Sequence, residues 1–253
     1  MKFATFVDQT IALTVANMKS RYRDTFTGLI WVILNPLIMF GAQAVAFSQI
    51  LKVDIPSFNL YLLLGLLPWL FINQSVQMTA SLLVHSGAFL KAYNIHPFVI
   101  IAANVLDNFI NFTLAFLLVL LPALYLSGQA SIQFVLLVAP ALLLAIFTLF
   151  LCWLIAMTNV FFRDTAFVAT FLLNISFYLT PIFYTARMID EKYRWLINYN
   201  VFYIIIRPFQ SLLVDVQLSF VDVFAIAFGL TAILIGLVTL IWRWRKNEFY
   251  SYL

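Results

Sequence analysis

The residues best suited to chemistry in this sequence form a polar stripe inside a long apolar run. Four of them recur at intervals of three and four, which places them on one helix face; they are Asn104, Asp107, Asn108 and Asn111. A carboxylate in an apolar run is a functional candidate by default. The alternative is that Asp107 and its neighbouring amides seal a contact between helices. We favour the contact, because a lone carboxylate makes a poor acid–base pair.

A second stripe combines aromatic rings with an amide in the apolar run 166–185. Its members lie at i, i+4, i+7 and i+11 on one helix face; they are Phe167, Phe171, Asn174 and Tyr178. Such rings offer flat apolar platforms, and tyrosine adds a polar tip. A sugar chain could slide along them without being held. Packing against lipid is the alternative, and the spacing alone favours it, since the chain has 27 phenylalanines and chance stripes are common.

Motifs that mark known catalytic or metal sites do not occur in the sequence. There is no GxxxxGK[ST] phosphate loop, no G-x-S-x-G and no H-E-x-x-H. No cysteine and histidine residues have zinc-binding spacing. The single cysteine, Cys152, has no intrachain disulfide partner and is expected to be a small core residue. We therefore expect no enzyme activity, no metal and no cofactor in this chain.

The composition is that of a membrane protein. Hydrophobic residues make up 64% of the 253 residues and charged residues 9%, against about half and about a quarter in soluble domains. A pI of 9.2 would suit nucleic acid only if the cations were clustered. Here 14 Lys and Arg face 10 Asp and Glu without a run of five basic residues. Nucleic acid is therefore not an expected partner.

Six apolar stretches are each long enough to cross a membrane, which takes about 20 residues in a helix. They are residues 29–51, 59–82, 98–126, 133–157, 166–185 and 221–242. Prolines 68, 140 and 181 fall inside these stretches and would kink the helices. The predicted fold is an all-α membrane protein with six transmembrane helices.

The distribution of cations predicts the orientation. Six spans place both termini on one side. With the termini inside, nine cations are cytoplasmic and five are outside. Cytoplasmic loops carry the excess of Lys and Arg, so both termini are predicted to be cytoplasmic.

The first 28 residues predict a surface helix rather than a signal peptide. Asp8 and Gln9 interrupt the first apolar stretch before a cleavable core forms. Apolar residues recur every three or four positions through 3–20, as in an amphipathic helix lying on a membrane; they are Phe3, Val7, Ile11, Val15 and Met18. A frayed cytoplasmic tail is the alternative. At the corner that follows, Arg21 and Arg23 can meet lipid phosphates.

The segment 185–220 lies between the fifth and sixth predicted spans. Its two apolar pieces, 193–206 and 209–218, are each too short to span. Arg207-Pro208 is expected to separate them. A re-entrant hairpin and an ordinary outer loop with surface helices both remain open.

Several of these stretches together resemble the ABC-2 type polysaccharide exporter permeases. The sequence SRYRDTFTGLIWVILNPL is similar to the family signature that enters the first span. The matching residues are Arg21, Tyr22, Arg23, Thr25, Gly28, Trp31, Pro36 and Leu37. Thr27 stands where the family usually has leucine.

Three further stretches extend the resemblance over nearly the whole chain. FLKAYNIHP (89–97) resembles the loop after the second span, and residues 160–184 resemble the fifth span, with Arg163-Asp164 at its start. NYNVFYIIIR resembles an Asn-Pro…Arg element, in which Asn200 and Arg207 match. Val201 stands where proline is usual, which weakens inference about the shape of that segment.

The resemblance implies the transmembrane subunit of an O-antigen-type exporter in the bacterial inner membrane. Such a subunit works as a homodimer with two separate ATPase subunits, which bind ATP and Mg. Its cargo is a polysaccharide on a polyprenyl diphosphate lipid. The chain would be one transmembrane domain, with an interface helix at 1–28, five spans at 29–185, a periplasmic gate at 186–220, and the sixth span with a cytoplasmic tail at 221–253.

The resemblance also implies roles for individual residues. Those expected to line a channel at the dimer interface are Trp31, Asn35, Phe167, Phe171, Asn174, Tyr178 and Tyr184. Those expected beside the lipid diphosphate at the entrance are Arg21, Tyr22 and Arg23. Those expected to couple to the ATPase are Phe89, Lys91, Tyr93, His96 and Pro97. Those expected in the periplasmic gate are Tyr193, Trp195, Asn200 and Arg207.

Three alternatives stay open. The first is an ABC-2 permease for teichoic acid, a capsule lipid or a small drug. The second is a transferase acting on polyprenyl lipids, which usually needs paired acidic residues at the membrane face. The third is a secondary transporter, which commonly shows broken helices in repeated halves, and no convincing internal repeat is present.

Overall fold

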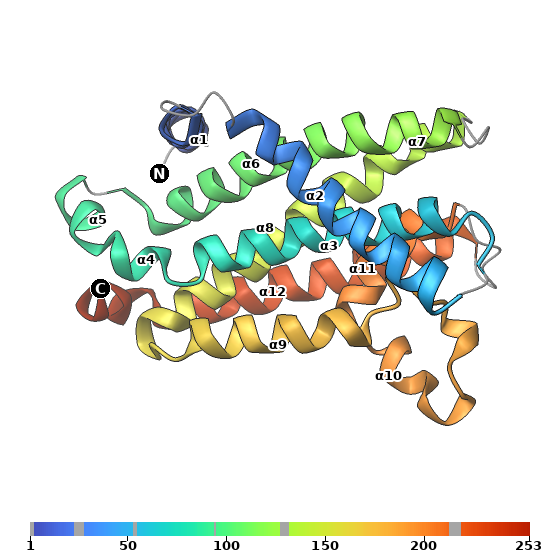
Figure 1. The fold of residues 1–253 in the computed structure, drawn as a ribbon. Helices are drawn as coiled ribbons and strands as arrows, with labels where there is room; N and C mark the ends of the chain where they lie inside the picture. Colours follow the sequence, from blue (N-terminus) through green and yellow to red (C-terminus); the bar gives the residue numbers. More distant parts are fainter. Residues whose placement is uncertain (1–2, 23–27, 53–54, 94, 127–131, 213–218) are drawn as a thin grey trace.

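The computed structural model describes residues 3–22, 28–52, 55–93, 95–126, 132–212 and 219–253. All regular elements in these ranges are helical, as expected for a chain in lipid, where a helix satisfies its own backbone hydrogen bonds. The long helices run side by side, and α1 and the end of α12 lie at the same end of the bundle (Figure 1). The loop carrying α4 and α5 lies at that end too.

Four stretches in the described part of the chain are long and apolar enough to cross a membrane: Phe58–His85, Pro97–Ala123, Val135–Phe161 and Phe220–Tyr252. The helices that form them are α3 (Phe58–Thr79), α6 (Pro97–Ala115) with η2 (Phe116–Leu120) and α7 (Leu121–Leu126), η3 (Ile132–Leu137) with α8 (Val138–Phe161), and α12 (Phe220–Tyr252). These agree with four of the six predicted spans.

The other two predicted spans are not among these four stretches, so the count of six is not confirmed. The first is α2 (Gly28–Ala44), continued by the π-helical η1 (Val45–Ile50). The second is α9 (Thr165–Leu179), which has 15 residues and is about 22 Å long, against a hydrocarbon core of about 30 Å.

The position of Pro181 explains the early end of α9. We expected Pro181 inside a span that reached residue 185, and this was wrong. Proline disfavours helical backbone at the residue before it, and Thr180 is extended, with φ −92° and ψ 129°. Pro68 and Pro140 do lie inside helices, in α3 and α8.

Helix α3 forms the centre of the core. Its leucines 62, 64 and 66 are completely buried, because α3 packs against α6, α8, α9, α11 and α2. A helix that is apolar on every side suits such a central position. Cys152 on α8 is also completely buried, as expected for a core residue.

The segment after α9 consists of short helices: η4 (Ala186–Met188), η5 (Glu191–Tyr193), α10 (Arg194–Asn198) and α11 (Val201–Gln210). The expected break at Arg207-Pro208 was wrong, since α11 runs through Pro208. The chain instead breaks before Asn200, whose side-chain oxygen accepts hydrogen bonds from the N–H groups of Phe202 and Tyr203 at 2.9 and 3.1 Å. This is an N-cap, which starts a new helix there.

Helix α11 packs into the bundle rather than over its surface. It contacts α3, α12 and α8. Its buried side chains are Tyr203, Ile205, Ile206, Pro208, Phe209 and Gln210. The helix is apolar enough to bury most of its circumference in this way.

Candidate functional site

One face of α9 is exposed along its whole length. Phe167, Phe171 and Tyr178 are 78%, 63% and 69% exposed, and Asn174 is exposed between them. The opposite face rests on α3 and α8 and buries Leu173. The four residues of the predicted stripe therefore lie on one exposed face of the single chain.

Two further candidates lie on α2, which also packs on α3. Trp31 is 56% exposed, and Asn35 is exposed one turn later. Tyr184, the last member of the channel set, is half-buried, and its hydroxyl donates to the carbonyl oxygen of Tyr178 at 3.1 Å. The channel candidates are thus exposed residues on α2 and α9, together with Tyr184, which hydrogen-bonds to the C-terminal end of α9.

The basic stretch at 21–23 falls at the corner between α1 (Phe3–Tyr22) and α2. Arg21 and Tyr22 are the last residues of α1, and Arg23 lies outside the described residues. In Figure 1, α1 is seen end-on while the long helices run across the view, so α1 lies across the bundle.

The short helices α4 (Leu82–His85) and α5 (Gly87–Tyr93) form an exposed projection beside the end of α12 (Figure 1). Phe89, Lys91 and Tyr93 are exposed on α5, and the rings of Phe89 and Tyr93 lie 4.9 Å apart. Gly87 lies against the chain end, since an added Cβ would be 2.8 Å from the carbonyl oxygen of Leu253. The projection is thus anchored to α12 at its base.

His96 and Pro97, the other coupling candidates, point inward. Pro97 is buried, and the ring of His96 packs 6.3 Å from that of Trp153 and 5.4 Å from that of Trp242. His96 Nδ1 accepts a hydrogen bond from the N–H of Phe98 at 3.2 Å and so caps α6. Burial lowers the pKa of His96 below its ordinary value of 6.5. Of the five coupling candidates, the exposed ones are therefore Phe89, Lys91 and Tyr93.

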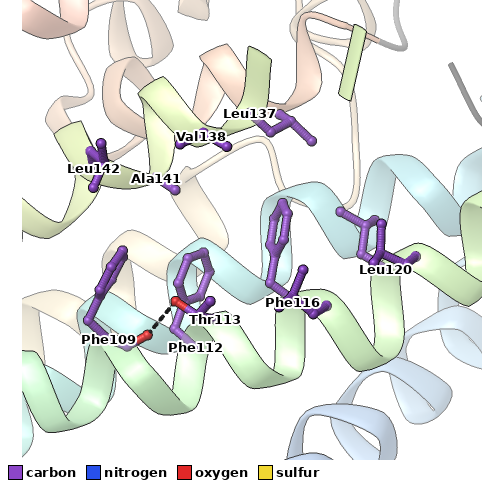
Figure 2. Close-up of a pocket in the computed structure, with 11 residues that line it drawn as sticks. Phe109, Phe112, Thr113, Phe116, Leu120, Leu137, Val138, Ala141 and Leu142 are labelled. Carbon is purple, nitrogen blue, oxygen red and sulfur yellow. Dashed lines mark hydrogen bonds between the residues drawn. The ribbon is translucent and has the colours of Figure 1, made fainter. Parts of the chain in front are cut away.

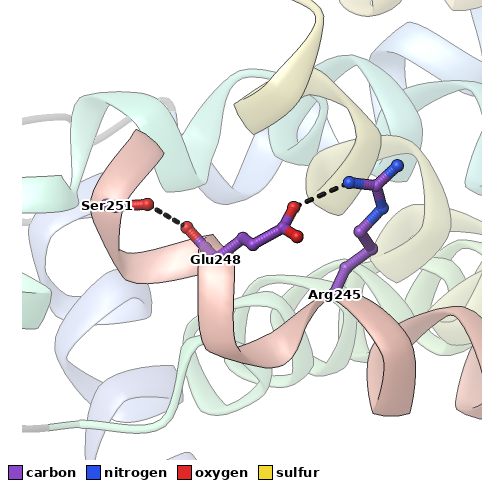
Figure 3. A network of polar contacts seen from close by, with 3 residues as sticks. All are labelled: Arg245, Glu248 and Ser251. Carbon is purple, nitrogen blue, oxygen red and sulfur yellow. Dashed lines mark hydrogen bonds and ion pairs between the residues drawn. The ribbon is translucent and has the colours of Figure 1, made fainter.

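The last turns of α12 carry a polar network at the same end of the bundle (Figure 3). Arg245 pairs with Glu248 at 2.7 Å, and the Ser251 hydroxyl donates to the Glu248 carbonyl oxygen at 2.6 Å. The Arg245 guanidinium lies 5.7 Å from the centre of the Phe161 ring, which ties α12 to α8. An exposed ion pair adds little stability, so these contacts mainly orient a cationic surface.

The four gate candidates lie in two different settings. Tyr193 at the end of η5 and Trp195 on α10 are exposed, whereas Asn200 caps α11. Arg207 is half-buried, 5.6 Å from the centre of the Tyr203 ring. Its Nε is buried without a hydrogen-bond partner among the described residues. The structure therefore does not gather these four side chains into one cluster.

The polar stripe of α6 lies at helix contacts, in line with the interpretation that we favoured. Asp107 is completely buried, and Asn108 is 4% exposed. The Asn108 amide donates to the hydroxyl of Ser75 on α3 at 3.2 Å. Among the described residues no group of three His, Cys, Asp or Glu side chains could hold a metal ion.

A cavity of about 300 Å³ lies between α6 and α8 (Figure 2). Its walls are apolar, with Phe109, Phe112 and Phe116 on one side and Leu137 and Val138 on the other. The hydroxyl of Thr113 donates to the carbonyl oxygen of Phe109 at 2.8 Å. Charged side chains do not line this cavity, so its chemistry is that of hydrocarbon packing.

Sequence reasoning missed residues whose importance depends on contacts with distant helices. Trp153 and Trp242 enclose His96 from α8 and α12. Tyr61 and Gln210 bond to the segment that follows α9. No periodicity marks these residues, because each is a single side chain in an apolar helix.

Comparison with known proteins gives a consistent family assignment. The pattern of the ABC-2 type transporter family matches residues 8–214. The chain is 27% identical to the O-antigen export system permease protein RfbA of Myxococcus xanthus over 241 residues, which cover 94% of this chain and 93% of that protein. Two RfbA proteins of Klebsiella pneumoniae are 27% and 26% identical, over 84% and 91% of this chain and 83% and 90% of their own lengths. This chain therefore belongs to the ABC-2 type transporter family of membrane permeases.

Proposed function

We propose that this chain is the transmembrane subunit of an ABC transporter that exports a polysaccharide linked to polyprenyl diphosphate, of the O-antigen type. Two copies form the passage, and two ATPase subunits that bind ATP and Mg drive it. The names of the relatives, all O-antigen export permeases, support this cargo. The membrane-spanning fold without a nucleotide-binding motif of its own fits a subunit powered in trans.

The exposed face of α9 carries the proposal. An amide side chain facing lipid is costly, because hydrocarbon offers it no hydrogen-bond partner. Asn174 on α9 and Asn35 on α2 are nevertheless both exposed within apolar helices. A second subunit and a watery passage between the two copies would satisfy these amides. Phe171 and Tyr178 would then offer flat rings to a passing sugar chain.

The end of the bundle that holds α5 suits the ATPase subunits. It presents exposed aromatic rings beside Lys91, and aromatic residues are enriched in protein–protein interfaces. The bias of cations toward this end favours a cytoplasmic location for both termini, in the bacterial inner membrane. Arg21 in the last turn of α1 and Arg23 in the following segment would then stand beside the diphosphate of the cargo lipid at the cytoplasmic entrance.

The experiment that tests this function is deletion of the gene in its host, with an assay of lipid-linked glycan on each side of the membrane. We expect full-length polymer on polyprenyl diphosphate to accumulate inside and to disappear from the surface. The wild-type gene in trans should restore export. If glycan synthesis itself stops, the chain is a transferase; if the surface glycan is unchanged, the cargo is another molecule.

A further inference from the structure

The chain leaves α9 through a buried extended segment whose backbone needs hydrogen-bond partners. Thr180 is extended, and the residues from Thr180 to Phe183 are all buried. The last carbonyl groups of a helix have no partners within it. Proline at 181 also has no N–H of its own to donate. The Thr180 carbonyl oxygen accepts from the N–H of Ile182 at 2.7 Å, and the carbonyl oxygens that follow it need donors from elsewhere.

Two buried side chains from other helices meet these carbonyl oxygens. The Tyr61 hydroxyl of α3 lies 3.1 Å from the Pro181 oxygen and 2.9 Å from the Tyr184 oxygen, so its single proton is shared between them. The Gln210 amide of α11 donates to the same Pro181 oxygen at 3.0 Å. Tyr61 and Gln210 are each only 3% exposed.

Asn200 adds a third connection. While its oxygen caps α11, its amide nitrogen donates to the Leu179 carbonyl oxygen at 3.2 Å and to the Thr180 hydroxyl oxygen at 3.1 Å. One side chain thus holds the start of α11 and the end of α9 together. These bonds join residues 20 and 21 positions apart in the chain.

Gly65 on α3 makes room for this arrangement. A Cβ at this position would lie 2.6 Å from Gln210 Nε2 and 3.3 Å from the Cα of Ile182. A side chain here would push away both the donor and the backbone that it holds. Glycine is thus required by close packing.

We propose that Tyr61, Asn200 and Gln210 are positioning residues that clamp residues 180–184, so that α9 and α11 move as one body. Helix α9 otherwise packs mainly on α3 and α8, so these bonds are its polar link to α11. This consequence rests on the proposed function: during transport, a movement of the aromatic face of α9 would also move α11. If these three side chains only filled space, removal of their hydroxyl or amide groups at constant shape would have no effect.

The clamp can be tested by cysteine labelling, because Cys152 is the single native cysteine. In a Cys152→Ala background, Ile182→Cys places a thiol at a site that is completely buried. We expect Tyr61→Phe and Gln210→Leu each to raise its rate of maleimide labelling in membranes about tenfold. This ratio corresponds to loss of about 1.4 kcal/mol, a typical net hydrogen-bond contribution.

Two controls separate clamping from general loosening. Tyr203→Phe removes the hydroxyl of another buried tyrosine, which is not among the side chains that bond to residues 180–184 in the described part of the chain, and should leave labelling unchanged. Leu62→Cys, also completely buried on α3, should stay unlabelled in every variant. Because labelling needs no cargo, its outcome does not depend on whether export takes place.

Unchanged labelling of Ile182→Cys in both clamp variants would overturn the proposal, and so would a parallel rise at Leu62→Cys. If labelling rises as expected, export by Tyr61→Phe should be slower than export by Tyr203→Phe. Equal export rates in these two variants would overturn the coupling of α9 to α11. Failure of the wild-type chain to export would overturn the proposed function and leave the labelling result standing.

Discussion

The Thr14 hydroxyl on α1 lies 3.2 Å from the Ala103 carbonyl oxygen on α6, 89 residues away in the chain, and shares its single proton between this oxygen and the Thr10 carbonyl oxygen at 2.8 Å. Thr10 is buried one turn earlier, so α1 rests on α6 with its small hydroxyl residues. Ile11 and Val15 consequently point away and are 51% and 43% exposed. A helix forms where the amphipathic one was predicted, with two of its apolar residues turned outward, and its place on the membrane surface stays a prediction.

Helix α1 is therefore expected to place Ile11 in lipid. With 3.6 residues per turn, Ile11 and Ala16 lie at opposite edges of its exposed surface. An environment-sensitive dye on Ile11→Cys should emit at shorter wavelength than the same dye on Ala16→Cys, in a Cys152→Ala background. Nitroxide-labelled lipid should quench the first dye more strongly. Equal emission and equal quenching at both positions would contradict a surface-bound α1.

The exposed face of α9 is expected to matter for transport and not for folding. Phe171→Ala combined with Tyr178→Ala should slow export several-fold, because both rings are exposed and their removal uncovers no core. The amount of protein in the membrane should stay the same. Phe228→Ala with Ile233→Ala on α12 is the matched control, since these side chains are also exposed. Normal export by the α9 double variant would show that this face of α9 does not line the channel.

Reversal of the charge on α5 is expected to weaken binding of the ATPase subunits. Lys91→Glu changes an exposed residue beside Phe89 and Tyr93, and we expect its affinity for the ATPase to fall roughly fivefold or more, mainly through slower association. Co-purification and binding kinetics would measure this. Lys192→Glu, an exposed change in the segment between α9 and α11, should have no effect. An unchanged affinity for Lys91→Glu would place the coupling surface elsewhere.

The half-buried ring of His96 is expected to make stability depend on pH. Its pKa is lowered by burial in the folded protein, so the unfolded chain binds more protons below the ordinary value of 6.5. This contribution to stability is therefore complete above 6.5 and is lost as the pH falls from that value through the lowered pKa of the folded protein. Protonation would also remove the Nδ1 acceptor that caps α6.

The matched variant is His96→Asn, which keeps a capping acceptor but does not titrate. Between about pH 7.5 and about pH 5.5, thermal unfolding of the purified protein should shift downward more for the wild type than for this variant. His85 is unchanged in both proteins, so a difference between their shifts reports on position 96. Parallel shifts in the two proteins would show that His96 does not control the pH response.

Local pattern was sufficient for much of the fold. The apolar runs at 59–82, 98–126, 133–157 and 221–242 all became long helices, because a chain with 64% hydrophobic residues must satisfy its backbone internally. The period of the 167–178 stripe also predicted its single face. Both inferences depend only on neighbours within a few turns of helix.

The tertiary structure decided what local pattern could not. Helix α11 begins at the N-cap Asn200 and continues through Pro208. His96 turned inward because Trp153 and Trp242 meet it from other helices.

By itself, the sequence determined that this chain is a helical membrane protein with an aromatic face on α9. The fold alone decided which buried donors meet the Pro181 carbonyl oxygen, since Tyr61 and Gln210 come from helices far apart in the chain. Helical period follows from local backbone geometry, whereas the pairing of distant polar groups depends on how the helices pack.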